Sequence, residues 1–313
     1  QLKVWENTVP GGSRAFVMSH LVRAVLDFVW GLRIVTAVAV LGSAVPAHAV
    51  HTITCGPHFR VHQLELGTMA NYQYVLEDGQ VAVSVDAAWS VPRIRRHADK
   101  LGVRLVGALY THGHFDHVGG QVPGGPSVEG ASSVSRHFAA GSEDIPLWLG
   151  AGDLAAASRQ TGLHIESFTS LEDGQGLFPF AGLRVEVIHT PGHSAGGVSY
   201  LVRSEIASEA CPDGILFTGD TVFIKAVGRT DLPGASTEEL LRSLSRLSNL
   251  GNRTLFLSGH SYDSPPRHAA LQEILEGNSW MQEGVRRYPP GTQPLPYSVM
   301  NHPRGGDLVR GEL

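Results

Sequence analysis

Short apolar segments separated by glycine-rich turns follow one another along the chain from about Phe59 onward. Alternating apolar and polar positions, or a short unbroken apolar run, are typical of β-strands with one or both faces buried. This pattern predicts strands at 61–66, 72–76, 81–85, 103–110, 183–188, 198–202, 214–217 and 254–257. The turn Glu77-Asp78-Gly79 between the second and third of these predicts that the domain opens with a meander.

Two segments combine helical periodicity with signals for the helix ends. Ser90 precedes the first, Pro92 lies in its first turn and Gly102 follows its last apolar position, which predicts a helix over 91–101 capped by Ser90. Ser236 and Glu239 form a capping box in front of leucines spaced three or four apart, which predicts a second helix there.

The other stretches complete the expected architecture. The Gly-, Ser- and Pro-rich stretch 121–144 is expected to be a long surface loop, one further helix is expected from Arg267 to about Glu283, and 288–313 to be a Pro- and Gly-rich tail. Strands outnumber helices, and the helices follow strands without strict alternation. The sequence therefore predicts an α+β fold.

The first fifty residues differ from the rest in being apolar. A run from Ile34 to Val45 follows Arg33 and precedes the small-x-small sequence Ala47-His48-Ala49, which is the order of a secretory signal. The run is too short for a span, which takes about 20 apolar residues. We expect residues 1–52 to be a targeting segment and the protein to be secreted or periplasmic, with organelle targeting or a membrane anchor as the alternative, and no stable transmembrane span.

Composition narrows the classes of function. The formal net charge is −5 and no block of consecutive basic residues occurs, so we exclude a nucleic-acid partner, because phosphate binding needs clustered cations. The two cysteines, Cys55 and Cys211, are too few for a metal cluster and could form one disulfide; we expect two unpaired thiols. The chain is rich in histidine, with 16 residues, which directs attention to metal binding.

Three imidazoles and a carboxylate lie between positions 112 and 117, directly after the predicted strand that ends at Tyr110. Nitrogen and oxygen donors in one place suit Zn or Fe. Side chains two positions apart in an extended or looped backbone point the same way. His112 and His114 can therefore bind one ion, and Asp116 and His117 are left to face a second.

Three further polar residues each follow a glycine at the end of a predicted strand. They are His193, Asp220 and His260. Strand ends deliver side chains to one rim of a sheet, and the preceding glycine lets the backbone turn sharply there. Together with the first cluster they make seven candidate metal ligands.

In this order, the seven residues resemble the motifs of metallo-β-lactamase-fold hydrolases, and in particular of the glyoxalase II-like branch, across residues 59–287. The resemblance implies a four-layer αβ/βα sandwich, with a catalytic domain at 53–287. It implies two Zn²⁺ ions, with Fe or Mn as alternatives. By the resemblance, one ion is bound by His112, His114 and His193, the other by Asp116, His117 and His260, and Asp220 bridges both.

The resemblance extends to two candidate substrate contacts. Segment 217–234, with its turn Gly228-Arg229-Thr230-Asp231, is similar to the corresponding segment of that branch, and Tyr262 matches a tyrosine that contacts glutathione in glyoxalase II. Arg229 and Tyr262 are thus expected to bind substrate. The alternative is that Arg229 forms a local ion pair with Asp231 and that Tyr262 only packs.

Two adjacent cations lower the pKa of a shared water and polarise a carbonyl, so hydrolysis of an acyl bond is the expected reaction, with a metal-bridging hydroxide as nucleophile. The motif supplies no general acid, which favours a small thioester such as an S-acylglutathione, because a thiolate leaves unaided near its pKa of about 8.5. Asp116 is expected to orient the hydroxide and is the candidate catalytic residue.

Three alternatives stay open from the sequence. The first is a persulfide dioxygenase with one iron, since that related branch also has a GRTD turn and a tyrosine after the last histidine. The second is a lactonase or β-lactamase, of a type other than the one with a cysteine ligand, because Asp220 occupies that position. The third is a non-catalytic metal-binding protein. The presence of all seven candidate ligands argues against it, because such a protein would be expected to have lost some of them.

Overall fold

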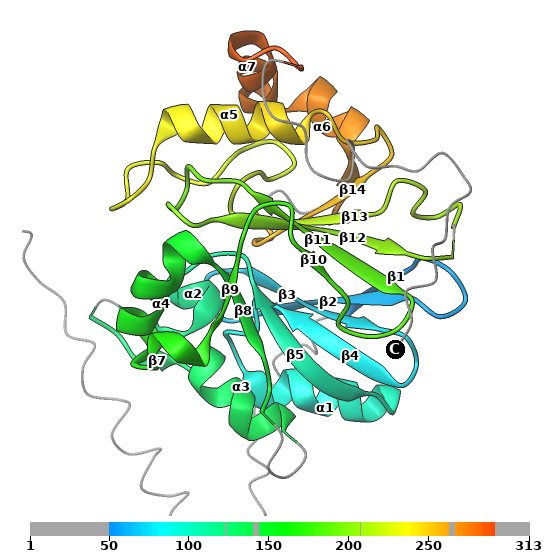
Figure 1. The fold of residues 1–313 in the computed structure, drawn as a ribbon, viewed down its shortest axis with the longest axis vertical. Coiled ribbons are helices and arrows are strands. Elements are labelled where there is room, and N and C mark those ends of the chain that lie inside the picture. Colours follow the sequence, from blue (N-terminus) through cyan, green and yellow to red (C-terminus); the bar gives the residue numbers. More distant parts are fainter. Residues whose placement is uncertain (1–49, 123, 140–143, 207, 263–266, 292–313) are drawn as a thin grey trace, which may run out of the picture. The chain divides into compact units, whose positions relative to one another are not determined.

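A computed structural model describes residues 50–122, 124–139, 144–206, 208–262 and 267–291 (Figure 1). The predicted targeting segment therefore lies outside the described residues except for its last three positions, and so does the predicted tail from 292 onward. No helix among the described residues is long and apolar enough to span a membrane.

Two sheets form the centre of the described domain. The first has the strand order β1 (His51–Thr54), β2 (Arg60–Leu66), β3 (Asn71–Glu77), β4 (Val81–Val85), β5 (Arg104–Tyr110), β8 (Leu147–Gly150) and β9 (Thr169–Leu171). The second has the order β10 (Gly176–Leu177), β11 (Leu183–His189), β12 (Val198–Ser204), β13 (Ile215–Gly219), β14 (Leu255–Ser258) and β15 (Ala269–Ala270). All eight predicted strands are confirmed, with ends that differ by at most two residues.

Helices cover the outer face of each sheet (Figure 1). Next to the first sheet lie α1 (Val91–Leu101), α3 (Gly130–Phe138) and α4 (Leu154–Thr161), and α2 (Phe115–Val118) follows β5. Next to the second sheet lie α5 (Thr237–Leu247), α6 (Leu271–Gly277) and α7 (Ser279–Arg287). The layers are helix, sheet, sheet and helix, which confirms the predicted α+β sandwich.

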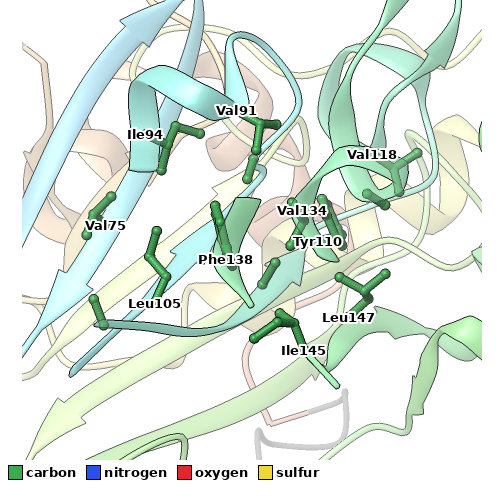
Figure 2. Packing of buried hydrophobic residues seen from close by; sticks show 14 of the residues in the cluster. Val75, Val91, Ile94, Leu105, Tyr110, Val118, Val134, Phe138, Ile145 and Leu147 are labelled. Atoms are coloured by element: carbon green, nitrogen blue, oxygen red, sulfur yellow. The ribbon is translucent and has the colours of Figure 1, made fainter. Parts of the chain in front are cut away.

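Three apolar clusters hold these layers together. One lies between the sheets and includes Tyr74 of β3 and Phe217 of β13, whose rings meet edge to face at 4.9 Å. A second joins the first sheet to its helices, and Figure 2 shows Ile94 of α1 and Phe138 of α3 within it. A third joins the second sheet to α5, α6 and α7. Each sheet thus buries both faces, which keeps its strand ends in fixed positions.

The stretch 121–144 is not a long loop, contrary to prediction. It holds β7 (Ser127–Val128), which pairs with β6 (Gly120–Gln121), and then α3, whose Ala131, Val134 and Phe138 are buried. Its apolar positions do follow a helical spacing, but the intervening serines and glycines resemble those of a loop. Packing against the first sheet stabilises a helix that its local sequence does not favour.

Two predicted helix ends differ in detail. Ser90 precedes α1 as expected, but its backbone is left-handed (φ 52°) and its side chain makes no capping bond; the Glu129 carboxylate accepts the Val91 N–H instead, at 2.6 Å. Ser236 caps α5 as predicted, with its Oγ accepting the Glu239 N–H, but the reciprocal bond of a capping box is replaced, because the Ser236 N–H donates to the Gly192 carbonyl at 2.8 Å.

The single helix predicted from Arg267 to about Glu283 is wrong, because the chain forms β15, α6 and α7 there. Asn278 lies between the two helices, and its side-chain oxygen accepts the N–H groups of Trp280 and Met281. The Asn278 side chain thus caps the start of α7, so the segment forms two helices instead of one.

Cys55 and Cys211 form a disulfide, so the prediction of unpaired thiols is wrong. Their Cα atoms lie 5.3 Å apart although 156 residues separate them in sequence. The bond joins the end of β1 in the first sheet to the connection between β12 and β13 in the second. Only the packing of the two sheets brings the cysteines together, so nothing local in the sequence indicates the pairing.

Candidate metal centre

All seven predicted ligands meet at one rim of the sandwich. His112 follows β5, and His193, Asp220 and His260 follow β11, β13 and β14. The remaining three are delivered by α2 and the residue before it: His114, Asp116 and His117. All are buried except His114, which is partly exposed. The expectation that strand ends bring these side chains together agrees with their observed placement.

The first three histidines form one group. Ligand-type nitrogens of His112, His114 and His193 lie within 4.8 Å of one another. His114 Nδ1 lies 2.9 Å from His193 Nε2. Three imidazoles at this spacing can hold a single cation, and the third comes from the other sheet.

Asp116, His117 and His260 form a second group with the same spacing limit. His117 Nε2 lies 3.2 Å from His260 Nε2, and Asp116 Oδ2 lies 3.3 Å from the same His260 nitrogen. Asn71 donates its side-chain N–H to Asp116 Oδ2 at 3.1 Å, which fixes the carboxylate toward the histidines.

Asp220 lies between the two groups. Its Oδ1 is 3.3 Å from His117 Nε2, and its Oδ2 is 3.3 Å from His260 Nε2 and 3.6 Å from His193 Nε2. One carboxylate thus faces nitrogens of both groups, which is the arrangement that a bridging ligand requires.

Backbone carbonyls set the tautomers of two histidines. His193 Nδ1 donates to the Arg229 carbonyl at 2.8 Å, and His260 Nδ1 donates to the Met69 carbonyl at 2.9 Å. Because a carbonyl only accepts, each Nδ1 carries a proton, so in the neutral ring the lone pair lies on Nε2, which faces the centre of the site.

Asp86 sets the tautomers of two more. His117 Nδ1 donates to Asp86 Oδ2 at 2.9 Å. The Thr111 hydroxyl also donates to Asp86 Oδ2, at 2.8 Å, so its oxygen is free to accept from His112 Nδ1, at 3.1 Å. In the neutral rings of His112 and His117 the lone pair therefore also lies on Nε2.

These lone pairs make the site suitable for cations. His112 Nε2 is buried and has no hydrogen-bond partner, the Nε2 atoms of His117 and His260 face each other, and His193 Nε2 faces Asp220. A buried acceptor without a partner is costly, and a divalent cation with nitrogen and oxygen ligands satisfies it. The donor set fits two such ions.

In the absence of bound cations, histidines of the two groups differ in pKa. Burial by itself would lower the pKa of His260, but the carboxylates of Asp220 and Asp116 outweigh it and raise that pKa to about 9. For His114, burial and the facing His193 lower the pKa to about 4. Cation binding to His260 therefore displaces a proton, whereas His114 binds a cation without losing one.

Glycines allow the groups to approach so closely. A Cβ atom at Gly259 would lie 2.5 Å from Asp220 Oδ1 and 2.7 Å from His117 Cε1. At Gly228 it would lie 2.0 Å from the Asp220 carbonyl oxygen. These positions have no room for a side chain.

The two predicted substrate contacts lie beside the centre. Arg229 pairs through two N–H groups with Asp231, at 2.6 and 2.7 Å, which is the local ion pair considered above. The Tyr262 ring stacks on His260, with centroids 4.4 Å apart, and is 58% exposed. Arg229 thus meets the metal centre through its backbone carbonyl, and Tyr262 presents a phenol at its rim.

Sequence reasoning missed Asp86, Asn71 and Asp153. Asp86 directly follows the predicted strand 81–85 and so shares the strand-end position of His193, Asp220 and His260, but it lacks their preceding glycine. Asn71 and Asp153 have no such signal, because their roles depend on contacts between distant segments. Asp153 accepts hydrogen bonds from Gly113, Ser194 and Gly196.

Comparison with known proteins places this geometry in a family. The profile of the Metallo-beta-lactamase superfamily matches residues 139–260. The uncharacterized protein Rv2581c of Mycobacterium tuberculosis is 32% identical over 209 residues, which cover 62% of this chain and 87% of that protein. The chain belongs to the metallo-beta-lactamase superfamily.

Two relatives of this chain are named for hydrolysis. The probable polyketide biosynthesis zinc-dependent hydrolase BaeB of Bacillus velezensis is 28% identical, over 72% of this chain and 88% of its own length. The hydroxyacylglutathione hydrolase GloC of Haemophilus influenzae is 26% identical, over 67% and 94%. This chain is a metallo-hydrolase of the superfamily.

Solved structures agree on the fold. A metallo-beta-lactamase from Staphylococcus aureus superposes with a TM-score of 0.59 at 18% identity, covering 78% of this chain and 71% of that one. At this identity the likeness supports the four-layer architecture alone.

Proposed function

We propose that this protein hydrolyses a small thioester, such as an S-acylglutathione, with two divalent cations, zinc in preference to iron or manganese. His112, His114 and His193 would hold one ion, and Asp116, His117 and His260 the other. The observation that carries the proposal is Asp220, whose carboxylate faces nitrogens of both groups. Such a carboxylate can bind two adjacent ions at once, whereas in a one-ion site Asp220 would be an ordinary ligand of that ion, so the metal content decides between the two.

Two bound cations would lower the pKa of a shared water toward neutrality and polarise the substrate carbonyl. The chain contributes the orientation of the attack. Burial alone would raise the pKa of Asp116, but His117, His260 and Asn71 outweigh it and lower that pKa, so the carboxylate stays ionised. Asp116 can therefore accept a hydrogen bond from the attacking water and direct its lone pair toward the carbonyl.

The groups at the metal centre also indicate which kind of leaving group the site can release. Among the described residues, the seven that form the centre offer acceptor atoms to it and no spare proton. Tyr262 lies at the exposed rim rather than among the seven, and a phenol, with an ordinary pKa of about 10, is a weak acid at neutral pH. A thiolate leaves without protonation, whereas an amine does not, so the site suits thioesters better than amides.

The likeness to GloC supports glutathione as the carrier, and Tyr262 supplies an exposed contact for it. Arg229 would contact a glutathione carboxylate only in exchange for its pair with Asp231. We therefore assign the thioester to the metal centre and the carrier contact to Tyr262.

Metal analysis of the purified protein tests the first half of the proposal. Two zinc ions per chain are expected; one iron, with oxygen uptake on addition of glutathione persulfide, would replace the hydrolase with a persulfide dioxygenase. Loss of S-lactoylglutathione absorbance on addition of enzyme tests the second half. A protein with two zinc ions and no turnover of any thioester offered would overturn the substrate class.

We also propose that the protein is exported and that residues 1–52 are its targeting segment, separate from a catalytic domain at 53–287. The Cys55–Cys211 disulfide supports export, because disulfides persist in oxidising compartments. N-terminal sequencing of the mature protein from its native host should find a start near Val50. A mature chain that keeps the apolar run would contradict cleavage.

A further inference from the structure

Asp153 lies next to the metal centre without belonging to it. It ends a short 3₁₀ turn (Ala151–Asp153) in front of α4 and is only 3% exposed. Three hydrogen bonds end on its carboxylate: from the Gly113 N–H at 2.9 Å, the Ser194 hydroxyl at 2.7 Å and the Gly196 N–H at 2.7 Å. A buried carboxylate with three such donors is well satisfied and rigid.

The donors come from two loops with a common role. Gly113 stands between His112 and His114, and Ser194 directly follows His193. The Asp153 carboxylate therefore ties together the two loops that carry the first histidine group. Asn71 contacts the second group, and Asp86 contacts both, His117 directly and His112 through Thr111, whereas the bonds of Asp153 all end on the loops that carry His112, His114 and His193.

Close packing leaves these loops little other freedom. A Cβ atom at Gly196 would lie 2.1 Å from the Asp153 nitrogen, and one at Gly113 would lie 3.3 Å from Asp153 Cβ. Both loops thus rest directly on the Asp153 backbone as well as on its carboxylate. A change in this carboxylate cannot be absorbed by moving one loop alone.

We propose that Asp153 is a positioning residue for the first metal position: it holds His193 against His112 and His114 so that three nitrogens converge on one ion. This rests on the proposed two-metal site. In Asp153→Asn, one oxygen becomes an N–H donor that faces a donor, so at least one of the three bonds is lost, and without the negative charge the remaining bonds hold the two loops less firmly. Changes in groups that orient metal ligands typically cost about 10- to 100-fold in metal affinity.

The test is a titration of metal-free protein with Co²⁺ in competition with a chelator, read by the visible absorption of the bound ion. Wild type should bind two ions tightly. Asp153→Asn should bind one with unchanged affinity and the other about 10- to 100-fold more weakly. Glu77→Gln is the matched control, since Glu77 is also fully buried and accepts a backbone N–H, but at the far end of β3 from Asn71.

Double variants locate the weakened ion. In His260→Ala, which retains the first group, adding Asp153→Asn should weaken the remaining ion; in His193→Ala, which retains the second, it should not. If Asp153→Asn does not fold, Ser194→Ala removes a single donor and should weaken the same ion more mildly.

The outcomes separate the two proposals. Two ions bound by Asp153→Asn with wild-type affinities would overturn the role of Asp153 and leave the hydrolase intact. Equal weakening in Glu77→Gln would show a general loss of structure and also overturn it. Failure of wild type to bind two ions would overturn the proposed function and this inference with it.

Discussion

Gly259→Ala should disable the metal centre with the addition of one methyl group. The new Cβ atom would lie 2.5 Å from Asp220 Oδ1 and 2.7 Å from His117 Cε1, and real Cβ contacts essentially never fall below 3.0 Å. The bridging carboxylate must therefore move by at least 0.5 Å, or the backbone before His260 must move instead. Either shift displaces a proposed ligand.

The expected loss can be estimated from that displacement. A misplacement of about 1 Å in a reacting group can cost about 100-fold in rate, so a shift of half that size or more should lower kcat by about 10- to 100-fold. Overpacking should also cost about 1 to 3 kcal/mol of unfolding free energy. The substitution should leave KM nearly unchanged, because Tyr262 and the outer rim stay in place.

Steady-state kinetics and thermal denaturation would measure both effects. Gly277→Ala is the control: it ends α6, a Cβ atom there meets nothing within 4 Å, and alanine favours the helix by up to about 1 kcal/mol. Wild-type kcat and two bound metal ions in Gly259→Ala would refute the reasoning, since they would mean that the close approach is not needed.

Three further predictions concern other parts of the molecule. Burial, and then the neighbouring His62, lower the pKa of His97 to about 4, so this side chain takes up a proton at higher pH in the unfolded chain than in the folded protein. The melting temperature should therefore decrease as the pH falls from 6.5 to 4, and it should decrease less in His97→Gln. An equal decrease in both proteins would contradict this assignment. Cys55→Ser removes the disulfide and should lower the free energy of unfolding, measured by denaturant titration, by about 2 to 5 kcal/mol. The kcat of the folded enzyme should stay unchanged. An unfolding transition at the wild-type denaturant concentration would mean that the bond does not form. Tyr262→Phe should raise KM for a glutathione thioester several-fold with little change in kcat, and identical kinetics would remove the carrier contact.

Much of what depends on neighbours along the chain was predicted from the sequence, with the exceptions of α3 and of the break between α6 and α7. The strands were predictable because alternation of apolar and polar residues reports directly which face is buried, as in β11, where the ladder with β12 runs over the whole predicted segment. The seven clustered side chains were predictable because strand ends collect at a rim. The Ser236 cap of α5 is equally local.

What the sequence did not predict depends on distant segments. Cys55 and Cys211 meet only when the two sheets pack, and Asp153 acquires its role only when the loops of His112 and His193 close around it. The cap on α1 comes from Glu129, well beyond the helix that it caps. In each case the partner is chosen by tertiary packing, which no periodicity records.

The origin of the ligands has a consequence for how this enzyme assembles. His112 and His114 follow a strand of the first sheet and His193 a strand of the second, and likewise Asp116 and His117 face His260 across the same boundary. A chain in which only one half has folded therefore holds at most two ligands of either group. Tight metal binding therefore requires that the two halves have docked, so it comes late in folding. A chelator should increase the rate at which the two halves come apart more than it affects the stability of either half alone.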